Sequence, residues 1–272
     1  MLLQRTLTAV LLAPLVILVI LLLPTWVFAP VVALACLAGL WEWTRLSGLR
    51  DRPVRGALLG VVLALFALLW WLRASLLWPV VLVAGVAWWV LACLWLQHFA
   101  FAAAPTAENR NLKLGAGALV IVPAFVGLLT IHASEPYGHW WALLTLLIVW
   151  AADIGAYFSG RFLGKRKLAP NISPGKTWAG VYGAFVAGAL VTVLGGWLLG
   201  ATGWRLLGLA LLAVFTVAAS VVGDLIESLM KRHAQVKDSG RMFPGHGGLL
   251  DRMDSVFAAV PVFALGKLLL GL

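Results

Sequence analysis

The chain has 272 residues, of which 63% are hydrophobic and 11% charged, with a mean hydropathy of +1.02 and a formal net charge of +10. A soluble globular domain is usually about 45–50% apolar, so this composition excludes a water-soluble fold and places the chain in lipid. The positive charge does not indicate a nucleic-acid partner, because the Lys and Arg residues follow a membrane-topology pattern.

Apolar runs long enough to cross a bilayer as helix recur along the chain. Backbone groups in lipid need internal partners, and the runs lack the alternation of barrel strands, so helix is the expected structure. The first run is long and followed by others, so we expect a retained membrane helix rather than a signal peptide. The sequence therefore predicts an all-α polytopic membrane bundle with about nine transmembrane helices. The predicted spans are residues 6–23, 26–44, 56–72, 76–96, 115–132, 140–158, 178–199, 205–228 and 255–272.

The Lys and Arg residues predict the orientation of these spans. With the N-terminus inside, all of the 20 Lys and Arg residues except Arg73, Arg205 and Lys267 fall in inside segments. Such a bias is typical of the cytoplasmic side of a membrane protein. It predicts that the two long polar loops, residues 159–177 and 229–254, are cytoplasmic.

The two halves of the chain differ in polar content. Residues 1–132 contain little beyond apolar spans, so we expect a transmembrane scaffold there. Glu42 is its exception, an acid near the end of the second span that we expect to snorkel or to pair with an arginine. Residues 133–272 hold both polar loops and are expected to form the catalytic region.

The sixth span ends in a polar helical stripe with side chains at positions i, i+4 and i+8. A short segment after it places two hydroxyls and an ammonium at a helix start, where anions bind well. The basic run 165–167 between them is expected to be a membrane anchor. The six side chains expected to contact substrate here are Asp153, Tyr157, Arg161, Ser173, Lys176 and Thr177.

Carboxylates stand at the adjoining ends of the last two spans. Asp224 shares a helix face with Ser228 and Lys231, while Asp251 and Asp254 lie where the final span begins. Ionisable groups at membrane depth are usually functional, and paired carboxylates suit Mg²⁺, whereas the absence of a Cys/His cluster argues against zinc. The alternative is that Asp224–Lys231 and Asp251–Arg252 are structural ion pairs.

The run from Ser228 to Asp254 carries most of the remaining polar side chains. The Gly-rich turn at 244–248 permits close backbone approach to an anion, and neighbouring cations supply charge for phosphates. The sequence leaves open whether His246 is a phosphate ligand or a turn residue. Those cations are Lys231, Arg232, Lys237 and Arg252.

Taken together, these residues resemble the phosphatidate cytidylyltransferase family, also called CDP-diacylglycerol synthases. The family signature reads S-x-x-K-R-x4-K-D-x-[GSA]-x2-[LIF]-P-x-H-G-G-x2-D-R-x-D, and residues 228–254 match every defined position. The segments 153–161 and 173–178 also look like the family. The resemblance covers roughly residues 150–257 and implies a membrane enzyme that uses Mg²⁺.

The resemblance implies transfer of a cytidylyl group from CTP to phosphatidic acid, giving CDP-diacylglycerol and pyrophosphate at a bacterial inner membrane. Our hypothesis makes Asp224 and Asp251 the metal ligands. The residues expected in catalysis are Lys237, Asp238, Arg252 and Asp254. The residues expected to bind substrate, besides the six named above, are Ser228, Lys231, Arg232, His246, Gly247 and Gly248.

The expected partners are CTP, phosphatidic acid and membrane lipid, with no nucleic acid. A second cation and a homodimer stay open. A different membrane enzyme of phospholipid synthesis is one alternative, although the D-G-x2-A-R pattern of CDP-alcohol phosphotransferases is absent. A transporter is the other, and it would place acids near the bilayer midplane in repeated halves, which the sequence does not show.

Overall fold

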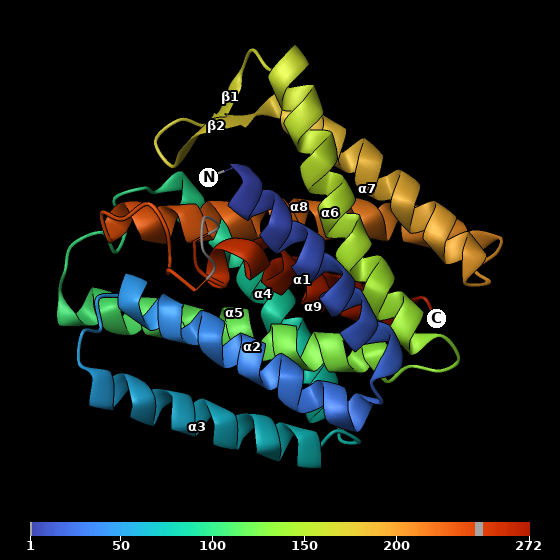
Figure 1. Cartoon of the computed structure of the whole chain (residues 1–272), viewed down its shortest axis with the longest axis horizontal. Helices are drawn as coiled ribbons and strands as arrows, with labels where there is room; N and C mark the ends of the chain where they lie inside the picture. Colours follow the sequence, from blue (N-terminus) through green and yellow to red (C-terminus); the bar gives the residue numbers. More distant parts are fainter. Residues whose placement is uncertain (1, 243–246) are drawn as a thin grey trace.

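The computed structural model describes residues 2–242 and 247–272, which form nine helices and one two-stranded hairpin (Figure 1). The predicted all-α bundle is confirmed, and each predicted span coincides with one helix. The helices are α1 (Leu2–Leu22), α2 (Thr25–Leu46), α3 (Arg52–Trp71), α4 (Leu77–Gln97), α5 (Ala107–His132), α6 (Gly138–Leu163), α7 (Trp178–Leu198), α8 (Trp204–His233) and α9 (Leu250–Leu269).

Seven of these helices, α2 to α8, are long and apolar enough to cross a membrane by length and composition. The chain is therefore an integral membrane protein. The apolar part described for α1 is shorter, Val10–Leu22. The final helix, α9, carries Asp251, Arg252 and Asp254 near its start and Lys267 near its end. A spanning role for α1 and α9 stays a prediction.

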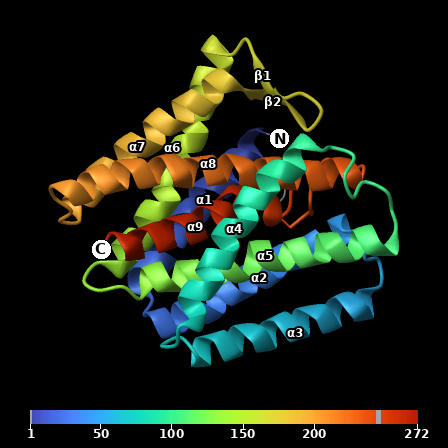
Figure 2. The same cartoon turned by 180° about the vertical axis from the view of Figure 1, so that it is seen from behind.

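Helix α9 occupies the centre of the bundle, surrounded by α8, α5, α4, α6 and α2 (Figure 2). Its residues from Val256 to Pro261 are buried, and Phe263 and Ala264 are at most 1% exposed. Helix α3 lies at one edge of the bundle and packs mainly on α2. Because α9 is central, the side chains at its start are held from several directions.

Glycines bring pairs of helix backbones into close contact. A Cβ at Gly183 of α7 would lie 2.6 Å from the Gly155 carbonyl oxygen of α6, and a Cβ at Gly223 of α8 would lie 2.5 Å from the Asp254 carbonyl oxygen of α9. Neither distance leaves room for a side chain, so both helix pairs depend on glycine. These contacts set the spacing of the helices that carry the polar residues.

The loop predicted at 159–177 contains a β-hairpin. Strand β1 (Lys167–Ala169) pairs antiparallel with β2 (Ser173–Thr177), with Lys167 opposite Thr177. Thr177 then begins α7, since its Oγ1 accepts a hydrogen bond from Gly180 N at 3.2 Å. The hairpin lies beyond the ends of α6 and α7 (Figure 1). Lys176 therefore lies on a strand, where the sequence predicted a loop.

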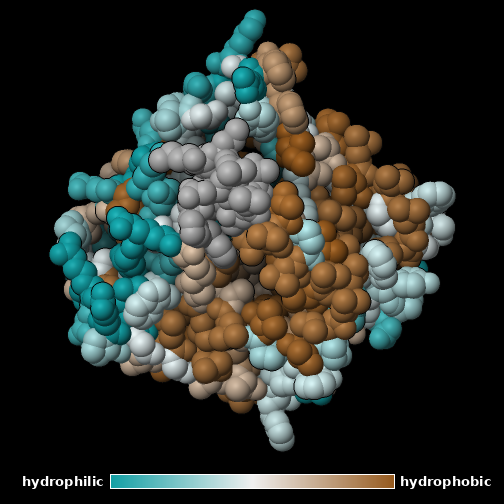
Figure 3. Space-filling view, in the orientation of Figure 1, coloured by the Kyte–Doolittle hydropathy of each residue, from teal (hydrophilic) through white to brown (hydrophobic). Residues whose placement is uncertain are grey.

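Hydrophilic residues gather toward one side of the molecule in Figure 3, near the hairpin and the loops that join α2 to α3 and α4 to α5. Hydrophobic residues cover much of the rest of this face, over α1, α6 and α7. This segregation fits a bundle with lipid around its middle and water at its loops. The polar loops predicted to lie on one side of the membrane are thus gathered at one end.

Candidate active site

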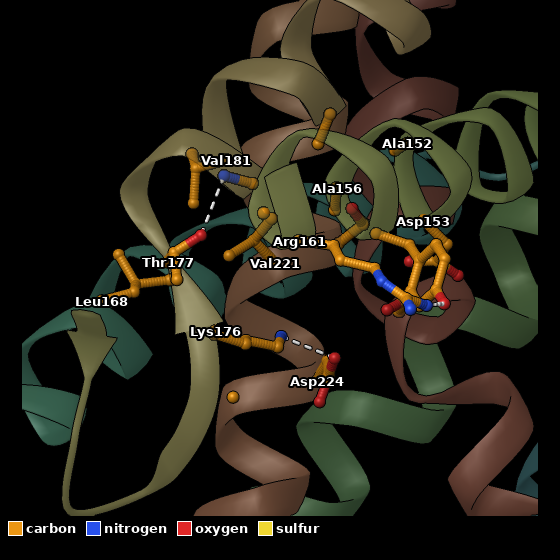
Figure 4. A pocket seen from close by; sticks show the side chains of 17 residues that line it. Ala152, Asp153, Ala156, Arg161, Leu168, Lys176, Thr177, Val181, Val221 and Asp224 are labelled. Atoms are coloured by element: carbon orange, nitrogen blue, oxygen red, sulfur yellow. Dashed lines mark hydrogen bonds and ion pairs between the residues drawn. The ribbon is translucent and has the colours of Figure 1, made fainter. Parts of the chain in front are cut away.

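A cavity of about 410 Å³ opens between α6, β2, α7 and α8 (Figure 4). Asp153 and Arg161 of α6, Lys176 of β2 and Asp224 of α8 line it. Figure 4 shows these polar side chains directed into the same space from three elements. Two carboxylates and two cations therefore face one cavity at the polar end of the bundle.

Lys176 and Asp224 form an ion pair across this cavity. Lys176 Nζ lies 2.5 Å from Asp224 Oδ2, and the side chains are 24% and 34% exposed. Ser228 Oγ donates to the other Asp224 oxygen at 3.3 Å. The alternative considered above, an Asp224–Lys231 pair, does not form. The partially exposed carboxylate instead faces a cation from the hairpin.

The predicted stripe on α6 lies along this cavity. Asp153, Tyr157 and Arg161 all line it, and Arg161 Nη1 donates to Tyr157 Oη at 2.5 Å. Thr177 also lines the cavity, although its hydroxyl oxygen caps α7. Ser173 does not, since it lies at the far end of β2, opposite Ala169. The structure thus gathers five of the six predicted side chains.

A second cavity of about 670 Å³ adjoins the first, because Asp153, Asp224 and Ser255 line both. One wall is charged and comes from α6, α8, α9 and the loop before α9. Another wall is apolar and includes Leu12 and Val16 of α1. The space therefore offers both charged and apolar surface. The charged residues that line it are Asp153, Asp224, Lys231, Asp238, Asp251, Arg252 and Asp254.

Lys231 joins α8 to α9. Its Nζ lies 2.8 Å from Asp251 Oδ1, and it also pairs with Glu227, one helical turn earlier. Glu227 is 1% exposed, so the pair is buried on one side. Sequence reasoning assigned Glu227 no role, although its i, i+4 spacing to Lys231 was a readable signal. Asp251 therefore pairs with a lysine of the neighbouring helix α8.

Asp251 organises the loop that precedes α9. Its Oδ2 accepts hydrogen bonds from Ser239 N at 2.9 Å and Gly248 N at 2.7 Å. A carboxylate near a helix start also favours the helix through the dipole. Asp251 was predicted as a metal ligand, and its present contacts give it a further part in shaping the loop.

The other predicted residues lie at varied positions. Arg232 Nε donates to Ile172 O at 3.1 Å and so ties the hairpin turn to α8. Lys237 is exposed and lines neither of the two cavities. Gly247 has φ +84°, a conformation that glycine adopts readily. His246, with Phe243 and Pro244 of the signature, lies outside the described residues.

The expectation that Glu42 snorkels or pairs with an arginine is wrong. Glu42 is 6% exposed, and its carboxylate accepts hydrogen bonds from Ser239 Oγ, Leu249 N and Leu250 N. A buried carboxylate is costly unless hydrogen bonds compensate it, and the start of α9 supplies them. Sequence reasoning missed this role because the partners lie about two hundred residues away.

The carboxylates of the second cavity fit Mg²⁺ by their chemistry. Mg²⁺ is commonly held by one or two carboxylates, with waters and substrate phosphates as its other ligands. No group of three or more His, Cys, Asp or Glu side chains is arranged to hold a metal within residues 2–242 and 247–272.

Comparison of the sequence with known protein families identifies the family of this chain. The profile of the cytidylyltransferase family matches residues 3–269. The chain belongs to this family. Among its members, the phosphatidate cytidylyltransferase of Pseudomonas aeruginosa is 41% identical over 97% of this chain and 96% of its own length. The Haemophilus influenzae protein of the same name is 37% identical over 97% of this chain and 98% of its own length.

A further relative matches about half of this chain. The phosphatidate cytidylyltransferase of Synechocystis is 48% identical, but over 50% of this chain and 46% of its own length. The Pseudomonas aeruginosa and Haemophilus influenzae proteins match this chain almost from end to end. The similarity therefore extends well beyond the C-terminal signature.

Proposed function

We propose that the chain transfers a cytidylyl group from CTP to phosphatidic acid, giving CDP-diacylglycerol and pyrophosphate. The observation that carries this proposal is the pair of adjoining cavities, which share Asp153 and Asp224. The second cavity reaches the apolar side chains of α1, as a lipid substrate requires, while charged groups lie where phosphates would meet. The names of the full-length relatives support the same reaction.

In the proposed reaction, a phosphate oxygen of phosphatidic acid attacks the α-phosphorus of CTP. The bond between the α-phosphorus and the bridging oxygen breaks, and pyrophosphate leaves with that electron pair. No protein nucleophile is needed, so the chain contributes positioning and charge. We propose that four cations neutralise the phosphates, which is supported by their lining one or the other cavity: Arg161, Lys176, Lys231 and Arg252.

We further propose that Asp224 and Asp251 hold Mg²⁺, with Asp254 beside them. When bound, Mg²⁺ would offset negative charge on the phosphates. Both aspartates now contact lysines, Asp224 with Lys176 and Asp251 with Lys231. An ammonium group can move from a carboxylate to a phosphate when a metal binds, so these lysines would serve both states.

The bacterial relatives and the basic loops support a place in the bacterial inner membrane with the site facing the cytoplasm. CTP would then enter from water and phosphatidic acid from the lipid. Lys237, Asp238, Ser173 and His246 stay proposed contacts of the same site, as do Arg232, Ser228, Gly247 and Gly248.

The deciding experiment incubates the purified protein in detergent with labelled CTP, phosphatidic acid and Mg²⁺. Formation of a labelled CDP-lipid together with pyrophosphate is expected. A parallel reaction with CDP-diacylglycerol and an alcohol tests for a different phospholipid-synthesis enzyme, and ion flux into liposomes tests for a transporter. Absence of the CDP-lipid from a folded preparation would refute the proposal.

A further inference from the structure

We propose that Glu42 and Arg45 of α2 are positioning residues, which hold the loop between α8 and α9 in the shape that the site needs. The inference rests on the proposed function, because it assigns these residues a part in that reaction. Both belong to the region predicted to be a scaffold. Neither lines one of the two cavities, so they would act through the loop rather than on substrate.

The Glu42 carboxylate binds the first residues of α9. Its Oε1 accepts from Leu249 N at 3.1 Å, and its Oε2 accepts from Leu250 N at 2.8 Å. The first N–H groups of a helix have no partner within the helix, and a negative charge there is favourable. A residue of α2 thus supplies the cap of α9, whose own N-cap position makes no side-chain hydrogen bond.

Ser239 connects Glu42 to Asp251. Its Oγ lies 2.8 Å from Glu42 Oε2 and 2.9 Å from Asp251 Oδ2. The hydroxyl has one proton, so it donates to one carboxylate at a time, while Ser239 N donates to Asp251 Oδ2 at 2.9 Å throughout. The orientation of Asp251, a proposed metal ligand, therefore depends on where Glu42 holds Ser239.

Arg45 also contacts this loop, from the same face of α2 as Glu42. Its Nη2 donates to the carbonyl oxygen of Ser239 and lies 3.4 Å from that of Asp238. Positions i and i+3 of a helix lie side by side, so Glu42 and Arg45 reach the loop together. Arg45 fixes the backbone next to Asp238, which lines the second cavity.

The glycines of the loop fit around Glu42. A Cβ at Gly240 or at Gly248 would overlap the Glu42 carboxylate, and one at Gly248 would also overlap Ser239 Oγ. Both glycines belong to the signature in residues 228–254. Their small size is therefore explained by a carboxylate from the other half of the chain, in addition to any approach of a ligand.

The test uses Glu42→Gln, Ser239→Ala and the double variant in the full-length protein. Glu42→Gln keeps the shape of the side chain but loses its charge. We expect kcat to fall roughly tenfold to a hundredfold, as for the loss of hydrogen bonds to a charged group. We also expect the Mg²⁺ concentration for half-maximal activity to rise severalfold, which a purely structural role would not change. The control is Glu108→Gln, an exposed acid at the start of α5.

The double variant tests the connection through Ser239. If Glu42 acts through Ser239, the two losses are not additive, and the double variant resembles the more damaged single variant. Additive losses, or an unchanged Mg²⁺ dependence in folded Glu42→Gln, would overturn the proposal. Should Glu42→Gln fail to fold, Arg45→Met takes its place. Its additivity with Ser239→Ala and its Mg²⁺ dependence are then measured in the same way.

Hydrogen exchange separates this proposal from the proposed function. Peptides that report on residues 238–242 and 247–250 are expected to exchange faster in Glu42→Gln than in the wild type, with no change in peptides from α3. This readout needs no activity. An inactive wild type with faster exchange in the variant would refute the reaction but keep the loop contact, while unchanged exchange would refute the loop contact itself.

Discussion

Lys176 Nζ lies 2.5 Å from Asp224 Oδ2, so an ion pair links the β-hairpin to α8 across the first cavity. Both side chains are partly exposed, which leaves room for a phosphate or a metal ion to compete for either partner. The pair ties the hairpin to α8 at the wall of the cavity.

Replacing Lys176 with alanine should lower kcat/KM by about a hundredfold, because a positioned cation that neutralises a phosphate is lost. Binding of Mg²⁺ should persist or strengthen, since Asp224 loses its competing ammonium. Steady-state kinetics and a thermal shift with added Mg²⁺ measure the two effects. Lys165→Ala is the matched control, because Lys165 is exposed and lines neither cavity. Equal losses in both variants would contradict a specific role for Lys176.

Asp224→Asn and Asp251→Asn should differ in their effect on folding. Both should raise the Mg²⁺ requirement, as expected for proposed metal ligands. Asp251→Asn should also lower the melting temperature, because Asp251 accepts hydrogen bonds from Lys231, Ser239 N and Gly248 N. Asp224 contacts only the partly exposed Lys176 and Ser228 among the described residues. Differential scanning fluorimetry in detergent measures this. Near-normal activity of both variants at limiting Mg²⁺ would refute the metal assignment.

Lys231→Met should destabilise the protein by about 3–5 kcal/mol, because it leaves the buried carboxylates of Glu227 and Asp251 without their cation. Adding Glu227→Gln should restore part of this stability, since one buried charge is removed. Activity should not return, because Lys231 is also proposed to contact phosphate. Unfolding in denaturant and the cytidylyl transfer assay measure the two quantities. A double variant no more stable than Lys231→Met would contradict the buried pair.

Gly183→Leu should destabilise the contact between α6 and α7, because its side chain would meet the Gly155 carbonyl oxygen and Ser159. Overpacking of this kind costs about 1–3 kcal/mol and would displace the cavity wall. The melting temperature and kcat should both fall. Gly60→Ala in α3 is the control, because open space surrounds that position and alanine favours helix. If Gly183→Leu melted at the wild-type temperature, the close contact between α6 and α7 would not contribute to stability.

The helices could be predicted from sequence because each contains a continuous apolar run, and a run such as 178–199 leaves little choice of structure. The hairpin at 167–177 could not, since its strands are only three and five residues long. One of its tertiary contacts is a hydrogen bond from Arg232, far along the chain, to the Ile172 carbonyl oxygen. Short strands carry too little periodicity to be recognised.

The sequence placed several of the polar side chains around the cavities but did not give their pairings. Helical spacing correctly placed Asp153, Tyr157 and Arg161 along one cavity. The alternative of an Asp224–Lys231 pair does not form: Asp224 pairs with Lys176 of β2, and Lys231 pairs with Asp251 of α9 as well as with Glu227 on its own helix. Local spacing describes neighbours on one helix, and the first two of these pairs join separate elements. Glu42 was missed for the same reason, because its partners lie on another helix far along the chain.

The central place of α9 has a consequence for how the protein is made. The ribosome synthesises α9 after the five helices that surround it, so those helices are made before the helix that they enclose. Packing around α9 would follow for the five helices that contact it, which are α2, α4, α5, α6 and α8. Insertion of α9 brings Asp251 and Asp254 to the polar end, so the candidate site and the centre of the bundle would be formed in the same step of biogenesis.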